Sequence, residues 1–167
     1  MGTSVGILTA TDEQIRGFTT DLDGLGNQFI GVVGNPRACH LHEFWDGLHF
    51  LLTAETGNAL PLSALKRGDV DYADAADVTH AIYAATTKAF AQELAALSEP
   101  VLRRRYDPAR MLGGPDGTRV YPSRLWTPGG NDAVFRDLIS YFNRLRNYVA
   151  AAATAGNGLL ICRYEDY

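Results

Sequence analysis

Apolar residues near the start of the chain predict a strand followed by a helix. Val5, Ile7 and Leu8 form a short apolar run, which is typical of a strand. Thr11 and Gln14 have the spacing of a capping box, which predicts a helix over roughly 12–20. The glycine-bearing segment 21–36 has no clear helical or strand period, and we expect an irregular loop there.

The middle of the chain contains one strongly patterned helix and one alternating segment. Five residues fall at helical spacing: Leu41, Trp45, Leu48, His49 and Leu52. They predict a helix with a buried face over about 41–54. Apolar and polar residues then alternate over 78–83, which predicts a strand that ends at Thr86 and Thr87. Either threonine could cap the helix that follows.

The last third is helical and closes with a strand. Ser98 and Asp107 each precede a proline in a first helical turn, which predicts two further helix starts. One apolar stripe predicts a long helix that stops near Gly156; its residues are Phe135, Leu138, Ile139, Phe142, Leu145, Val149 and Ala152. Residues 159–164 read as a closing strand beside the first one.

These elements predict the α+β class, with a small mixed or antiparallel sheet packed against several helices on one side. The long C-terminal helix is followed by the terminal strand. The length of 167 residues, with 46% hydrophobic and 20% charged positions, indicates a single domain over 1–167. The sequence shows no leader peptide and no apolar run long enough for a bilayer, so we expect a cytoplasmic protein with no membrane partner.

The formal net charge of −4 conceals an uneven distribution. Residues 1–100 carry 5 basic and 13 acidic side chains, whereas residues 101–146 carry 9 basic and 4 acidic ones. One interpretation of this arginine-rich 101–146 segment is a solvated face paired with the acidic first part. The other is a patch that binds phosphate or nucleic acid. The acidic total disfavours a dedicated nucleic-acid binder.

The sequence contains no dinucleotide fingerprint, no P-loop and no nucleophile elbow, so it predicts no cofactor. The remaining candidate chemistry lies in residues 40–49. On one continuous helix, His42, Asp46 and His49 would share a face and could hold a metal ion. Alternatively, Asp46 and His49 could act as an orienting carboxylate and a general base. The plainer interpretation is a histidine at the core edge and a locally paired aspartate.

The run from Trp45 to Thr53, the downstream segment 61–64 and the pair Tyr121–Pro122 resemble the YfbM-like family of bacterial proteins. This family is named for a domain of unknown function. The resemblance implies a bacterial α+β domain and gives no activity, substrate or cofactor. The family pattern favours glycine where this chain has Ala54, so we expect the turn after the helix to shift toward Gly57.

Large rings beside titratable or charged groups commonly line ligand pockets, which makes five residues candidates for binding a ligand or partner. They are Trp45, His49, Tyr121, Arg124 and Trp126. The two tryptophans would serve equally well as core residues whose indole N–H groups bond to the backbone.

Three functional hypotheses follow. The first is a non-enzymatic binding or interaction protein, regulatory or of the immunity type, with a possible protein partner and an unknown small-molecule ligand. The second is a small hydrolase that uses Asp46 and His49. The third is phosphate or nucleic-acid binding through residues 101–146.

Overall fold

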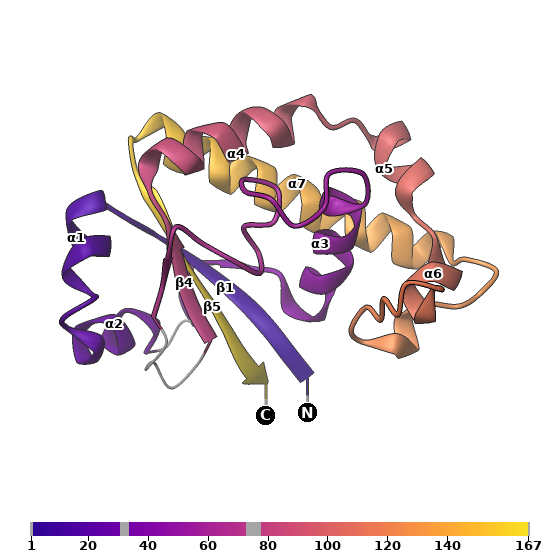
Figure 1. Cartoon of the computed structure of the whole chain (residues 1–167), viewed down its shortest axis with the longest axis horizontal. Helices are drawn as coiled ribbons and strands as arrows, with labels where there is room; N and C mark the ends of the chain where they lie inside the picture. The colour runs from indigo at the N-terminus through magenta and orange to yellow at the C-terminus, as the bar shows by residue number, and fades with distance from the viewer. Residues whose placement is uncertain (1, 31–33, 73–77, 167) are drawn as a thin grey trace.

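The computed structural model of the chain describes residues 2–30, 34–72 and 78–166 (Figure 1). The strands are β1 (Gly2–Ala10), β2 (Cys39–His40), β3 (Val70–Asp71), β4 (Val78–Ile82) and β5 (Gly158–Asp166). The α-helices are α1 (Asp12–Gly17), α2 (Leu22–Phe29), α3 (Trp45–Thr53), α4 (Ala84–Ala96), α5 (Glu99–Arg105), α6 (Pro108–Gly113) and α7 (Asp132–Thr154). The described ranges also contain the 3-10 helices η2 (His42–Phe44) and η3 (Ser123–Leu125). The predicted α+β class is confirmed.

The strands form one antiparallel sheet in the order β2-β1-β5-β4-β3. Its longest pairing joins β1 to β5, with Gly2 opposite Asp166 and Ala10 opposite Gly158. The expected contact between the first and last strands is therefore confirmed, and the N and C labels lie side by side in Figure 1. Successive side chains of a strand point to opposite faces, so this pairing supplies apolar residues to both sides of the sheet.

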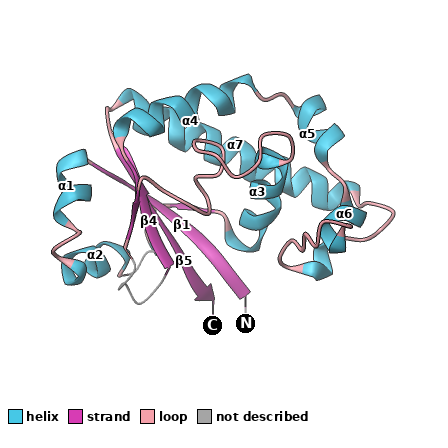
Figure 2. Ribbon diagram, viewed as in Figure 1, coloured by secondary structure: helices cyan, strands magenta, loops and turns pink. Residues whose placement is uncertain are grey.

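Helices cover both faces of the sheet (Figure 2). On one face, the core around Ile7 and Ile161 includes Phe90 of α4 and Phe142 of α7. On the other face, a separate cluster contains Leu8, Ala10, Ile15, Phe18, Leu25 and Leu160. The expectation of helices on one side alone was therefore wrong, because α1 and α2 bury their few apolar residues against the second face. Within the described ranges, no helix has both the length and the apolar content needed to cross a bilayer.

The segment predicted as a loop over 21–36 contains the helix α2. Its start is fixed by the Asp21 side chain, which accepts a hydrogen bond from the Gly24 amide at 2.9 Å. Leu25 is the buried residue on the inner face of the helix. The glycines at 24 and 26 lower the helix propensity of this segment, so propensity alone does not predict the helix. The capping side chain and the burial of one face stabilise the helix despite these glycines. Residues 31–33 of the predicted loop lie outside the described part.

The start of α4 also differs from the prediction. The helix begins at Ala84, so Thr86 and Thr87 lie inside it and do not cap it. The free amides at its start are bound by two carboxylates from elsewhere in the chain. Asp69 accepts from the Tyr83 amide and Asp12 accepts from the Ala84 amide, each at 2.8 Å. Tertiary contacts therefore set this boundary.

The predicted helix over 41–54 is divided in two. Residues 42–44 form the 3-10 turn η2, in which His42 has a φ of +44°, and α3 begins only at Trp45. After α3, Gly57 has a φ of +68° and its amide donates to the Thr53 carbonyl at 2.9 Å. The turn that closes the helix thus forms at Gly57, as the sequence predicts.

Gly47 allows close packing between α3 and the segment that precedes α7. A Cβ atom at this position would lie 2.6 Å from the Trp126 ring and 3.0 Å from the Leu138 side chain. We expect Gly47→Ala to lower the free energy of unfolding by about 1–3 kcal/mol, because the added methyl group would force the buried Trp126 ring or the helix to shift. Urea denaturation measures the change.

Gly26→Ala is the matched control, because a Cβ atom added at this exposed helical glycine would have no neighbouring atom within 4 Å. It should raise stability by about 0.5–1 kcal/mol through helix propensity. Equal stability of the two variants would contradict the close approach at Gly47.

Candidate functional site

Helix α3 is buried from Trp45 to Leu52 and carries two polar side chains into the interior of the protein. Asp46 is 5% exposed and His49 is 6% exposed. A helix buried on all sides normally consists of apolar residues, because polar groups inside must replace the hydrogen bonds they made to water. The partners of these two residues therefore define the site.

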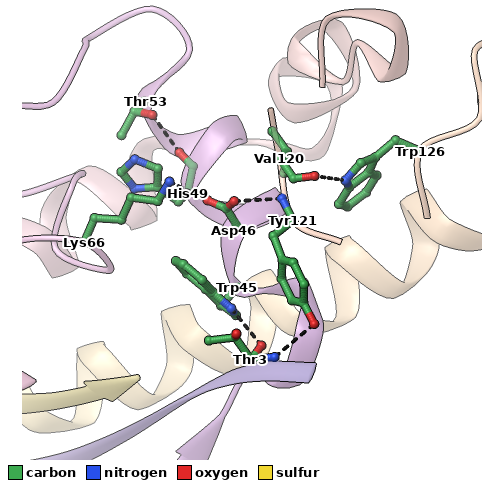
Figure 3. A network of polar contacts seen from close by, with 9 residues as sticks. All are labelled: Thr3, Trp45, Asp46, His49, Thr53, Lys66, Val120, Tyr121 and Trp126. Atoms are coloured by element: carbon green, nitrogen blue, oxygen red, sulfur yellow. Dashed lines mark hydrogen bonds and ion pairs between the residues drawn. The ribbon is translucent and has the colours of Figure 1, made fainter. Parts of the chain in front are cut away.

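Asp46 connects α3 to two other segments (Figure 3). Its Oδ2 atom accepts a hydrogen bond from the Tyr121 amide at 2.8 Å. Its Oδ1 atom forms an ion pair with Lys66 Nζ at 2.6 Å. Both carboxylate oxygens are thus occupied, one by a backbone amide and one by an ammonium group.

Trp45 and Tyr121 lie beside Thr3 at the start of β1, whereas Trp126 lies beside Val120 (Figure 3). The Trp45 indole donates to the Thr3 carbonyl at 3.0 Å, and the Tyr121 hydroxyl accepts from the Thr3 amide at 2.9 Å. The Trp126 indole donates to the Val120 carbonyl at 2.8 Å. Both tryptophans are buried, so these rings hold the framework together.

A cavity of about 430 Å³ opens beside α3. Asp46 and His49 lie on its wall, whereas Trp45, Tyr121, Trp126 and Arg124 belong to other parts of the structure. The other polar wall residues come from the end of α3, the turns after it, α6 and the loop after α6: Thr53, Glu55, Asn58, Lys66, Arg110, Thr118 and Arg119. The structure therefore brings two of the predicted residues together with a polar set that sequence reasoning missed.

His49 is held in its neutral form. Burial, followed by the nearby positive charge of Lys66, lowers the pKa of its imidazole from 6.5 to about 4. The Asp46 charge and a hydrogen bond with the Asn58 side chain oppose the shift, and Arg67 adds to it. At neutral pH the ring can therefore donate one hydrogen bond and accept another.

The pairing needed for a general base is not assembled around His49. The Asp46 oxygens are occupied by Tyr121 and Lys66, so the carboxylate acts on the imidazole only as a nearby charge. The His49 Nδ1 atom is buried and has no hydrogen-bond partner among the described residues. A catalytic histidine normally has its second nitrogen fixed by such a partner.

His42 lies apart from the cavity. It is exposed, and its ring lies 6.0 Å from the rings of both His40 and Tyr141. The positive φ at His42 breaks the helical register that would have aligned it with Asp46 and His49. Across residues 2–30, 34–72 and 78–166, no three His, Cys, Asp or Glu side chains are grouped to hold a metal ion.

Within the described ranges, four of the nine arginines of residues 101–146 form ion pairs, each with a different acidic residue. Arg103 pairs with Asp132, Arg105 with Glu55, Arg110 with Asp116, and Arg124 with Glu43. Arg105 also donates to the carbonyl groups of Leu51 and Leu52 and so caps the end of α3. Only Arg110 and Arg119 of the segment reach the cavity wall.

Fold and site together define an α+β protein with a polar cavity beside a buried helix. A family model described as a domain of unknown function (DUF1877) matches residues 3–162, and the chain belongs to this family. Among solved structures, it is similar to YfbM from Escherichia coli, a protein of unknown function. The identity is 17%, the match covers 96% of this chain and 99% of that chain, and the TM-score is 0.68.

No curated protein matches the chain. The YfbM-like resemblance is confirmed, and at this identity the structural likeness concerns the fold.

The Asp46 carboxylate should contribute to stability mainly through its bond to the Tyr121 amide. We expect Asp46→Ala to cost about 1–3 kcal/mol of unfolding free energy, because it leaves a half-buried amide without an acceptor. Asp46→Asn keeps an acceptor oxygen and should cost less. Thermal denaturation compares the two variants, and an equal loss in both would contradict the importance of this hydrogen bond.

The lowered pKa of His49 predicts a specific loss of stability in acid. The unfolded chain takes up a proton near pH 6.5, whereas the folded chain does so only near pH 4. Stability due to His49 is therefore complete above pH 6.5 and falls as the pH drops from 6.5 to 4. Relative to His49→Gln, the wild type should lose about 3 kcal/mol over this window. Urea titrations at several pH values measure the difference, and parallel profiles would contradict a buried neutral imidazole.

Proposed function

We propose that this protein is a non-enzymatic binding protein whose ligand is a small polar molecule held in the cavity beside α3. The observation that supports this proposal is the convergence of polar side chains from separate segments on one space of about 430 Å³. Binding sites for small molecules fall in this range of volume and use a few placed polar groups to orient the ligand.

Binding is favoured over hydrolysis by the state of His49. A general base needs its imidazole oriented by a second group, and both oxygens of Asp46 are engaged by Tyr121 and Lys66. A pKa near 4 also makes the ring a weak base at neutral pH. The neutral imidazole is suited instead to hydrogen bonding with a bound molecule.

A small ligand is favoured over a large apolar docking face. Among the described residues, Ile30 is the one large hydrophobic side chain that is strongly exposed, and the tryptophans are buried. Protein interfaces commonly expose aromatic anchors or extended apolar patches. A regulatory role would then act through occupancy of the cavity.

The test is a binding screen followed by nuclear magnetic resonance, with neutral, anionic and cationic small molecules against the isotopically labelled protein. Ligands should shift the amide signals of residues 53–58 and 118–120, which border the cavity. Ala54→Trp places a large ring on the cavity wall and should weaken binding by at least about tenfold. Ala95→Trp is the matched control, because Ala95 is exposed on α4 away from the cavity.

Two results would contradict the proposal. One is that no compound in any charge class perturbs the cavity signals at millimolar concentration. The other is catalytic turnover of p-nitrophenyl esters or phosphates that is lost in His49→Ala while the variant remains folded, since this would establish hydrolysis.

A further inference from the structure

We propose that the ligand of this cavity carries a phosphate group, bound by the guanidinium groups of Arg110 and Arg119 and the ammonium group of Lys66. The inference rests on the proposed function, because it requires a ligand in the cavity. The three cations come from three different segments and share one wall. Phosphate oxygens accept charge-assisted hydrogen bonds from such groups, and guanidinium groups match their geometry.

The acidic residues of the cavity are already neutralised by the protein. Asp46 is bound by Lys66 and by the Tyr121 amide. Glu55 is paired with Arg105 at 3.1 Å. Arg119, by contrast, is exposed and forms no ion pair within the described ranges. Lys66 and Arg110 are in turn paired with Asp46 and Asp116, so the positive charge left over on the cavity wall is that of Arg119, and it favours an anionic ligand.

The loop that carries Arg119 is held in place by local contacts. Asp116 pairs with Arg110 at 3.1 Å and accepts a hydrogen bond from the Thr118 amide at 3.1 Å. The Arg110 guanidinium also lies over the Phe50 ring, 5.4 Å from its centroid. These contacts orient Arg110 and Thr118 before any ligand arrives, which reduces the entropy lost on binding.

His49 provides a sensor inside the same cavity. Lys66 and Arg67 both lower the pKa of its imidazole beyond the effect of burial, whereas Asp46 and Asn58 act in the opposite direction. The ring thus lies in a region of positive potential. A bound anion would offset this potential and raise the pKa of His49.

The surroundings favour a small phosphate compound over nucleic acid. A space of about 430 Å³ holds a single small ligand. The neighbouring arginines that would extend a track along a nucleic-acid backbone are engaged elsewhere, Arg103 with Asp132 and Arg124 with Glu43. A phosphate monoester carries about two negative charges on three terminal oxygens, whereas a carboxylate carries one charge, so a wall with three cationic side chains suits the phosphate better.

The experiment is a titration of the labelled protein with inorganic phosphate, with glycerol 1-phosphate, succinate and glycerol in parallel. Phosphate should shift the amide signals of Gly57, Thr118 and Arg119 saturably, and binding should weaken at high salt. Arg119→Ala should weaken binding by at least about tenfold, because it removes a charge-assisted contact. Arg104→Ala removes an exposed charge of α5 outside the cavity and should leave binding unchanged.

A second readout follows the imidazole signal of His49 against pH. Saturating phosphate should raise the pKa of His49 in the wild type and less so in Arg119→Ala. Tighter binding of glycerol 1-phosphate than of free phosphate would support the proposal and identify an ester as the ligand.

The outcomes separate this inference from the proposed function. Glycerol or other neutral compounds that bind the cavity while both phosphates do not would overturn the inference and leave the binding function standing. Succinate that binds more tightly than either phosphate, with the same dependence on Arg119, would overturn the choice of phosphate. Absence of binding by both phosphates would overturn this inference, and the wider screen described above decides the binding function separately.

Discussion

The site depends on the burial of one carboxylate, that of Asp46. A charge inside a helix as buried as α3 is tolerated only where an ion pair and hydrogen bonds replace the lost water. Here they come from Lys66 in one loop and from the Tyr121 backbone in another. Satisfying one carboxylate therefore fixes two loops against the helix. The same loops continue into Asn58 and Arg119, so the position of the cavity wall follows from this single requirement.

The aromatic residues perform a complementary task. Gly47 lets the Trp126 ring approach α3, and the Trp126 indole holds the backbone of Val120. The Trp45 indole donates to the backbone carbonyl of Thr3, and the Tyr121 hydroxyl accepts from the backbone amide of the same residue. These two hydrogen bonds connect α3 and the Tyr121 loop to the first strand. Large rings thus provide rigidity, and the shorter polar side chains face the cavity. This division suits a preorganised binding site, in which the framework loses little entropy when a ligand arrives.

The parts of the fold that the sequence predicted are those governed by local signals. The apolar stripe of α7, the capping box at Thr11 and the closing strand β5 all follow from residues a few positions apart. The start of α4 was missed because its amides bind Asp12 and Asp69, which lie 72 and 14 positions away from their partners. No local period encodes such contacts.

The same distinction separates the predicted site residues from the missed ones. Asp46 and His49 were singled out because, together with His42, they have the spacing of one helical face that could hold a metal ion, or could act as a carboxylate and a base. Lys66, Asn58 and Arg119 were not, because each lies in a turn or loop whose place is set by tertiary packing. The one available signal was the arginine-rich composition of residues 101–146, and this signal did not distinguish Arg119 from arginines that pair with nearby acids.

Stability alone does not account for the imidazole at position 49. Folding favours an apolar side chain on a helix that is buried all around, because a polar ring gives up hydrogen bonds to water and here leaves Nδ1 without a partner among the described residues. Burial, followed by the charge of Lys66, lowers the pKa of this ring and keeps it neutral, although Asp46 and Asn58 act in the opposite direction. The cost at position 49 is the buried Nδ1 atom without a partner in the described part of the chain, and the unpaired charge there is that of Arg119. The phosphate ligand proposed above would account for both, because it accepts a hydrogen bond and supplies negative charge.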